Sequence, residues 1–128
     1  MAEMVRKGIY TIEFVLAMVV NTTDKKNSNL EIDGVNVYMN SDRYVTFKEK
    51  GTKCCKCGME GIYFALETDN PEHNRYHFNL YGIDEEGKEV LITKDHITPK
   101  SKGGKNHITN YHPMCIICNM DKGNKYIG

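Results

Sequence analysis

The apolar positions of the first fifty residues repeat only weakly. The most apolar run is Ile9–Val20, and a helix there would bring one face together, formed by Ile12, Val15, Leu16 and Val19. The β-branched residues of the same run also suit a strand, so periodicity alone does not separate the two. We favour the helix.

Polar residues then predict a turn over Asn21–Asn29. Two apolar runs flank Asp33-Gly34 within Leu30–Met39, a pattern that favours a hairpin. Tyr44–Lys48 alternates in the manner of another short strand. We expect residues 1–50 to be an N-terminal accessory segment with no assigned role, and residues 51–128 to form the functional domain.

The pattern sharpens after Lys53. An apolar strand is expected at Ile62–Leu66, and alternation predicts two more at Arg75–Gly82 and Glu89–Ile97, joined as a hairpin by the acidic turn Asp84–Gly87. The aromatic residues of the first hairpin strand are also typical of base stacking. We favour a core role, because their alternation should pack at least one face.

The C-terminal third begins with a basic loop. Pro99 and the run 100–105, with two glycines, break regular structure. A short strand follows at Asn110–Met114. A helix is then expected at Ile116–Asn124, with Gly123 close to its end.

Composition limits the chain to one small domain. It has 128 residues, 40% of them hydrophobic, and 17 basic residues balance 17 acidic ones. The overall charge therefore predicts no affinity for nucleic acid. From Lys94 onward, however, six lysines face only Asp95 and Asp121, a local excess of four positive charges that is typical of a phosphate-binding face.

The cysteines favour a metal over disulfides. They are odd in number, tightly clustered and not preceded by a signal peptide: Cys54, Cys55, Cys57, Cys115 and Cys118. The longest apolar run is too short to span a bilayer and too polar for a secretory signal. We expect a cytosolic protein without membrane association, located in the host cytoplasm if a phage encodes it.

Two cysteine pairs have the spacing of a structural zinc site. Cys54 and Cys57, and likewise Cys115 and Cys118, have two residues between them, and together they offer four tetrahedral sulfur ligands. Fifty-seven residues separate the pairs, so the fold must bring them together. The alternative is a set of reduced buried thiols, which two matched pairs make less probable than zinc. Cys55 is left over.

A short C-terminal segment also collects the parts of a phosphodiester-cutting site. His96 is a candidate base for activating water, and Asp95 and Asn119 are oxygen ligands for a divalent cation. Lys122 lies three residues beyond Asn119, on the same face of the expected helix, where it can contact a phosphate.

These residues resemble the HNH endonuclease family, in its zinc-containing branch common in phage and mobile-element nucleases. The resemblance covers Lys53 to Lys125 and rests on the following segments: Asp95-His96-Ile97-Thr98-Pro99, Ser101-Lys102-Gly103-Gly104, Asn110, and Cys115-Ile116-Ile117-Cys118-Asn119 with Lys122-Gly123. It implies an α+β fold with a small ββα-metal core (treble-clef-like, His-Me finger), a four-cysteine zinc site and an N-terminal extension.

The resemblance also implies roles. His96 would be the general base, Asp95 would bind a catalytic divalent ion, and Asn110 would orient the His96 ring. Many relatives have histidine where this chain has Asn119, and an amide oxygen there favours Mg²⁺ or Mn²⁺. Three loop lysines are expected to contact nucleic acid rather than serve only as solubilising charges: Lys100, Lys102 and Lys105.

The remaining histidines are expected outside the catalytic set. For His73 and His77 a surface or strand-face role is more probable than metal binding. His107 and His112 lie within the motif, but the resemblance does not require them.

The leading hypothesis is a metal-dependent DNA endonuclease that nicks one strand and leaves 5′-phosphate and 3′-hydroxyl ends. Its cofactors would be structural Zn²⁺ and catalytic Mg²⁺ or Mn²⁺, and it would act as a monomer or homodimer. Its substrate would be duplex DNA, with RNA a further possibility. The alternative is a zinc-stabilised nucleic-acid-binding module without catalysis, which has no need of an intact set of catalytic residues.

Overall fold

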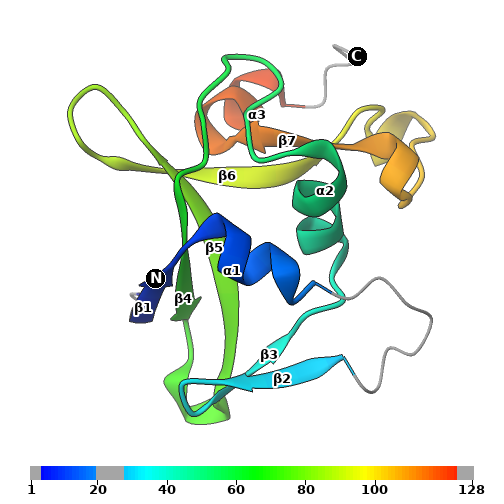
Figure 1. The fold of residues 1–128 in the computed structure, drawn as a ribbon. Coiled ribbons are helices and arrows are strands. Elements are labelled where there is room, and N and C mark those ends of the chain that lie inside the picture. Colours follow the sequence, from blue (N-terminus) through cyan, green and yellow to red (C-terminus); the bar gives the residue numbers. More distant parts are fainter. Residues whose placement is uncertain (1–3, 20–27, 124–128) are drawn as a thin grey trace.

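A seven-stranded mixed sheet runs through residues 4–19 and 28–123, the parts of the chain that the computed structural model describes (Figure 1). Two long antiparallel strands, β4 (Tyr63–Thr68) and β5 (Arg75–Ile83), lie at its centre, and β1 (Val5–Tyr10) pairs with the outer edge of β4. The other edge of β5 is shared. Its first residues pair in parallel with β3 (Val35–Tyr38), and its last residues pair with β6 (Glu89–His96).

The sheet ends in two hairpins. β2 (Asn29–Ile32) pairs with β3 on one side, and β7 (Tyr111–Cys115) pairs with β6 on the other. Helix α3 (Ile116–Lys122) follows β7 directly and packs back on both strands of the second hairpin. The chain thus builds a compact unit of two strands and one helix around the end of β6.

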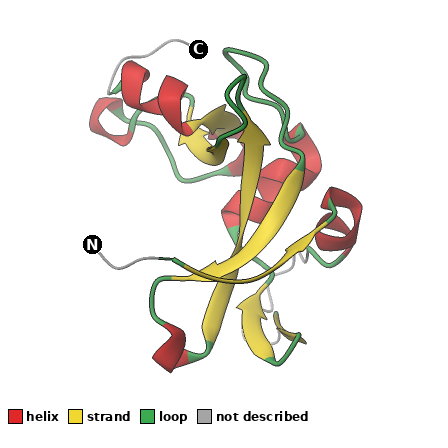
Figure 2. Cartoon of the chain, turned by 90° about the vertical axis from the view of Figure 1, so that its left-hand side faces the viewer, coloured by secondary structure: helices red, strands yellow, loops and turns green. Residues whose placement is uncertain are grey.

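Two further helices cover the sheet. α2 (Asp42–Lys50) packs on β6 and β7, which lie between it and α3 in Figure 1. α1 (Ile12–Ala17) contacts α2 and β4. Figure 2 shows the twist of the long strands from the side. Three short 3₁₀ turns complete the described elements: Pro71–His73, Lys100–Lys102 and Ile108–Asn110.

Aromatic rings form the centre of the core. Phe64 and Phe78 are fully buried on neighbouring strands with ring centroids 6.1 Å apart, and Phe47 of α2 lies 6.1 Å from Phe64. The buried Tyr44 hydroxyl accepts a hydrogen bond from the Phe78 backbone N–H at 2.8 Å. Helix α2 is therefore fixed to the sheet by both packing and a buried hydrogen bond.

Two sequence predictions need correction in the N-terminal part. Tyr44–Lys48, expected as a strand, lies within α2. Ser41 caps this helix by accepting from the Tyr44 N–H, Asp42 lies in its first turn and lysines lie in its last, so capping and the helix dipole outweigh a short alternating pattern. The run Ile9–Val20 was expected as one helix, but among its described residues, 9–19, it begins in β1 and is helical over Ile12–Ala17, where Thr11 caps α1.

The other predicted elements are confirmed. Asp33-Gly34 joins β2 to β3, and the Asp84 carboxylate accepts from two backbone N–H groups in the turn between β5 and β6. Helix α3 ends at Lys122, with Gly123 as its cap. The basic loop contains a 3₁₀ turn at Lys100–Lys102. Residues 21–27 of the expected turn lie outside the described residues, as does Lys125.

The expected α+β class is confirmed, with more sheet than helix. Strands and helices from residues 1–50 pair with and pack on elements from residues 51–128, so both parts share one sheet. A separate accessory role for the first part stays a prediction. No helix in the described ranges is long and apolar enough to cross a membrane.

Candidate functional site

The fold brings the two cysteine pairs together. The sulfur atoms of Cys54, Cys57, Cys115 and Cys118 all lie within 4.8 Å of one another. The sulfurs of Cys57 and Cys115 are 3.8 Å apart. A tetrahedral ion with Zn–S bonds of about 2.3 Å holds its sulfurs about 3.8 Å apart, so the cluster is compatible with a zinc site.

Local backbone structure sets this geometry. The sulfur of Cys115, the residue that caps α3, accepts from the Cys118 N–H at 3.4 Å, which places both sulfurs on the first turn. The segment Cys54–Gly58, a cysteine knuckle, is tied to β7 because the Cys55 N–H donates to the Pro113 carbonyl at 2.9 Å. The cysteine cluster therefore joins the knuckle to the hairpin and helix that carry the candidate active site.

The four thiols influence one another strongly. Burial opposes ionisation of Cys54, but hydrogen bonds with the backbone of Cys115, Cys57 and Lys56 lower its pKa to about 6. Burial and the neighbouring sulfurs raise the pKa of Cys118 well above its usual range. Cys55 is exposed and outside the cluster, and partial burial together with nearby negative groups raises its pKa.

A second constellation surrounds the end of β6. A pocket of about 300 Å³ there is lined by five of the predicted site residues, Asp95, His96, Lys100, Asn119 and Lys122, together with Pro99, Ser101 and Gly123. The β6 strand, the basic loop and α3 each contribute one side of it. The structure thus gathers the candidate base, the candidate metal ligands and a loop lysine in one cavity.

Asp95 is held by two cationic or potentially cationic groups. Its Oδ2 lies 2.5 Å from Lys122 Nζ and 3.0 Å from His112 Nε2. His112 faces Asp95 directly across the β6–β7 hairpin. In the described part of the chain, Oδ1 accepts no hydrogen bond and is the oxygen left for a cation.

Asn119 is fixed from the same side. Its Nδ2 donates to Thr93 Oγ1 at 2.9 Å. Thr93 and Asp95 are two residues apart on β6 and share one face of the strand. With the amide nitrogen engaged, the Oδ1 oxygen is the atom available to a metal, and oxygens from Asp95 and Asn119 fit a hard divalent cation.

The His96 ring is oriented by Asn106, a residue that sequence reasoning missed. Its Nε2 lies 2.8 Å from Asn106 Oδ1, and the ring stands edge-on to Tyr111 with centroids 5.1 Å apart. Because an amide oxygen only accepts, this contact requires a proton on Nε2, and in the neutral ring the lone pair then lies on Nδ1. Nδ1 is therefore the atom that can accept a proton from water.

Asn110 organises the loop rather than contacting the ring. Its Oδ1 accepts from the Thr98 N–H at 2.9 Å, and its Nδ2 donates to the carbonyls of Thr98 and Lys105 at 3.1 and 2.9 Å. Asn110 can therefore orient His96 only indirectly, by holding the loop that carries Asn106. These bonds close the loop that carries Asn106 over the end of β6.

Gly104 allows the loop to close tightly. A Cβ atom at this residue would lie 1.8 Å from the Thr98 carbonyl oxygen, and its own N–H donates to the Pro99 carbonyl at 3.0 Å. Gly103 adopts φ +88°, a left-handed conformation that favours glycine. Backbone conformation at Gly103 and lack of space at Gly104 therefore explain why both positions are occupied by glycine.

Lys122 lies in the same pocket as Asn119, and its ammonium is buried. Only 1% of its side chain is exposed, and Nζ donates to Asp95 Oδ2 and to the His96 carbonyl, each at 2.5 Å. The Lys122 ammonium therefore helps to fix the positions of Asp95 and His96. Contact with a phosphate would require it to leave both partners.

The three loop lysines are all exposed, and Lys100 also lines the pocket. His107 lies elsewhere, where its Nδ1 accepts from the Thr109 N–H and caps a 3₁₀ turn. His73 is exposed at the far end of β5, and His77 is half-buried on that strand. Both of these agree with the surface or strand-face role expected from the sequence.

A comparison with protein families agrees with this geometry. Residues 84–126 match the model described as HNH endonuclease. Over these residues, about a third of the chain, the sequence is similar to the HNH endonuclease family. The match contains every candidate catalytic residue and the second cysteine pair, and it supports a nuclease-like function in general. No match was found among curated proteins or among solved structures.

The HNH segment begins after the first cysteine pair, at residue 84. Cys54 and Cys57 therefore join the site through geometry and not through the family match. Two missed contacts had a signal in the sequence. Both lie on predicted strands: the observed register of β6 and β7 pairs His112 with Asp95, and strand alternation places Thr93 on the same face as Asp95. Asn106 had none, because its position depends on the path of the loop.

Proposed function

We propose that this protein is a metal-dependent endonuclease that hydrolyses phosphodiester bonds of DNA. The observation that carries the proposal is the pocket at the end of β6, where His96 lies beside Asp95 and Asn119. Metal-assisted hydrolysis needs a general base and oxygen ligands for a divalent cation, and these three side chains can supply both. Duplex DNA is the proposed substrate.

His96 is the proposed general base. Its Nδ1 takes a proton from a water molecule, and the water oxygen bonds to phosphorus as the bond to the 3′ oxygen breaks. The 3′ oxygen gains a proton from solvent, so the products carry a 5′-phosphate and a 3′-hydroxyl. Asn106 stabilises the imidazolium ring that forms, because its amide oxygen continues to accept from Nε2.

Asp95 and Asn119 would hold Mg²⁺ or Mn²⁺. Such a cation, when bound, supplies stabilisation for the negative charge that develops on the phosphate and the leaving oxygen. Lys122 and His112 hold the Asp95 carboxylate in place through its other oxygen. The loop lysines are proposed to position the strand, since phosphate contacts fix register without reading sequence.

Zinc is the proposed ion at the four cysteines. The sulfur spacing fits it, and all four positions are filled by protein, which is typical of a structural site. One pocket with one base cuts one strand at a time. The proposed product from a monomer is therefore a nick, and a double-strand break needs a homodimer or two events.

Cleavage of a duplex oligonucleotide labelled on each strand tests the proposal. Wild type is expected to cut only with Mg²⁺ or Mn²⁺ and to leave 5′-phosphate ends that a ligase accepts. Asn119→Ala should cut much more slowly, and Ile117→Ala, at an exposed position on α3, is the matched control. Metal-independent cleavage would contradict the proposed catalytic cation, and binding without any cleavage would leave the non-catalytic binding module as the better account.

A further inference from the structure

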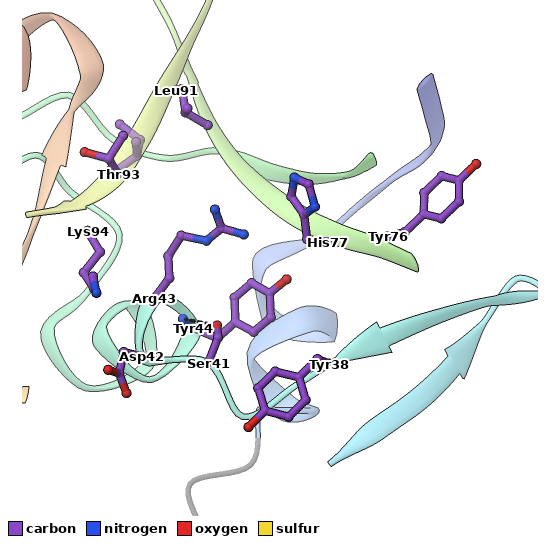
Figure 3. Close-up of a pocket in the computed structure, with 11 residues that line it drawn as sticks. Tyr38, Ser41, Asp42, Arg43, Tyr44, Tyr76, His77, Leu91, Thr93 and Lys94 are labelled. Atoms are coloured by element: carbon purple, nitrogen blue, oxygen red, sulfur yellow. Dashed lines mark hydrogen bonds between the residues drawn. The ribbon is translucent and has the colours of Figure 1, made fainter. Parts of the chain in front are cut away.

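A second pocket lies between the first turn of α2 and strands β5 and β6 (Figure 3). Its volume is about 580 Å³, within the range of small-ligand sites. The side chains that matter for its chemistry are Tyr38, Asp42, Arg43, His77 and Lys94. The proposed catalysis does not use this pocket, and most of its lining residues lie outside the family match.

Arg43 is only partly satisfied in this pocket. One terminal nitrogen donates to the Phe78 carbonyl at 3.1 Å, and the buried Nε has no hydrogen-bond partner among the described residues. Figure 3 shows the guanidinium group pointing into the pocket, toward His77. Guanidinium donors left without partners favour an anionic oxygen ligand, and the planar group suits phosphate.

Lys94 adds a second positive charge. Its Nζ lies 4.0 Å from the centre of the Tyr111 ring, and neither Lys94 nor Arg43 forms an ion pair within residues 4–19 and 28–123. Asp42 is the acidic residue lining the pocket, and its Oδ2 accepts from the Tyr111 hydroxyl at 3.2 Å. Arg43 also lies over the Tyr44 ring, 5.4 Å from its centroid. Two cations against one carboxylate leave the pocket with a net positive charge, which favours an anionic ligand.

One lining residue of this pocket, Lys94, lies close to the candidate catalytic residue His96. Lys94 and His96 are two residues apart on β6, which is about 7 Å along a strand. The Tyr111 ring contacts both side chains, with the His96 ring 5.1 Å away. A nucleic-acid strand cut beside His96 therefore passes close to Lys94.

We propose that this pocket binds a nucleotide next to the scissile phosphate. Arg43 and Lys94 hold the phosphate of that nucleotide, and Tyr38, which is 37% exposed, offers an aromatic surface to its base. The inference rests on the proposed nuclease function, because it assigns the pocket to the same substrate strand. It also gives the N-terminal part of the chain a role in substrate binding.

The test is DNA binding in a His96→Ala background, so that cleavage does not interfere. Fluorescence anisotropy with a labelled duplex is measured over a series of salt concentrations for Arg43→Met, Lys94→Met and Lys88→Met. Lys88 is the matched control, because its side chain is 74% exposed at the other end of the β5–β6 hairpin. Metal content and thermal unfolding confirm that each variant is folded.

Arg43→Met and Lys94→Met are each expected to weaken binding about tenfold and to reduce the slope of log K against log salt by about 0.9, the value for one lost phosphate contact. Lys88→Met should change neither. Unchanged affinity and slope in the folded Lys94→Met variant would overturn the proposal. A different result would assign the pocket to a small anion instead. Inorganic phosphate or pyrophosphate would raise the unfolding temperature of the protein but not of Arg43→Met, while neither variant would change DNA affinity.

Cleavage by the same variants in the wild-type background separates this proposal from the proposed function. If wild type cuts DNA and the Arg43 variant binds and cuts equally well, the pocket assignment fails and the nuclease stands. If both pocket variants lose binding but wild type cuts no substrate, the pocket stands and the nuclease fails.

Discussion

The buried contact between Lys122 and Asp95 gives the sharpest quantitative prediction. Nζ lies 2.5 Å from the carboxylate, with 1% of the lysine side chain and 11% of the aspartate side chain exposed. Breaking a buried pair by removing one partner costs about 3–5 kcal/mol. His112 still contacts the same carboxylate oxygen, so we expect Lys122→Met to lower the free energy of unfolding by about 3 kcal/mol, the lower end of that range.

Asp95→Asn should also destabilise the protein, because it leaves the Lys122 ammonium buried beside a neutral amide. The double variant Asp95→Asn/Lys122→Met removes both charges and should cost about 2 kcal/mol less than the sum of the two single changes. Urea unfolding at fixed zinc concentration measures all four proteins. If the two effects add within about 0.5 kcal/mol, or if Lys122→Met alone is as stable as wild type, Lys122 is not the buried support described here.

Three other predictions concern the loop, the metal and pH. Gly104→Ala should abolish most cleavage while the cysteine site keeps its metal, because the new methyl group would collide with the Thr98 carbonyl. Cleavage activity close to that of wild type would refute this steric argument. Cys57→Ser should lose the bound zinc and unfold at a lower temperature than a Cys55→Ser control, as metal analysis and calorimetry would show. Burial and the neighbouring Arg43 lower the pKa of His77 below 6.5, so the unfolded chain binds this proton more readily and stability should fall as pH drops through 6.5. His77→Asn should flatten that part of the stability curve against pH, and an unchanged slope between pH 7 and pH 5 would contradict it.

The sequence was most informative where local chemistry and strand alternation agreed. The hairpin of β5 and β6, the helix after Cys115 and the closeness of the two cysteine pairs all follow from short-range patterns. The pairs are the clearest case. Their matched spacing predicted a shared ion although 57 residues separate them, because two isolated pairs would each leave an ion half-coordinated.

The predictions failed where a cap or a tertiary contact decided the outcome. Tyr44–Lys48 has the alternation of a strand, but Ser41 starts a helix whose buried face packs on the sheet. The phosphate contact expected of Lys122 from its helical spacing stays a prediction. The spacing could not show that the ammonium is buried against Asp95 and the His96 carbonyl, because that arrangement is set by how α3 packs on β6. Asn106 depends in the same way on the path of the loop.

Nicking of supercoiled plasmid by wild type and His96→Ala tests the central claim most directly, provided that both proteins hold the same amount of metal at the cysteines. The account predicts that wild type converts the plasmid to the open circular form only when Mg²⁺ or Mn²⁺ is present, and that His96→Ala slows this at least about a hundredfold. Equal nicking rates for the two proteins would show that His96 is not the base, and the catalytic assignment of the β6 pocket would be wrong.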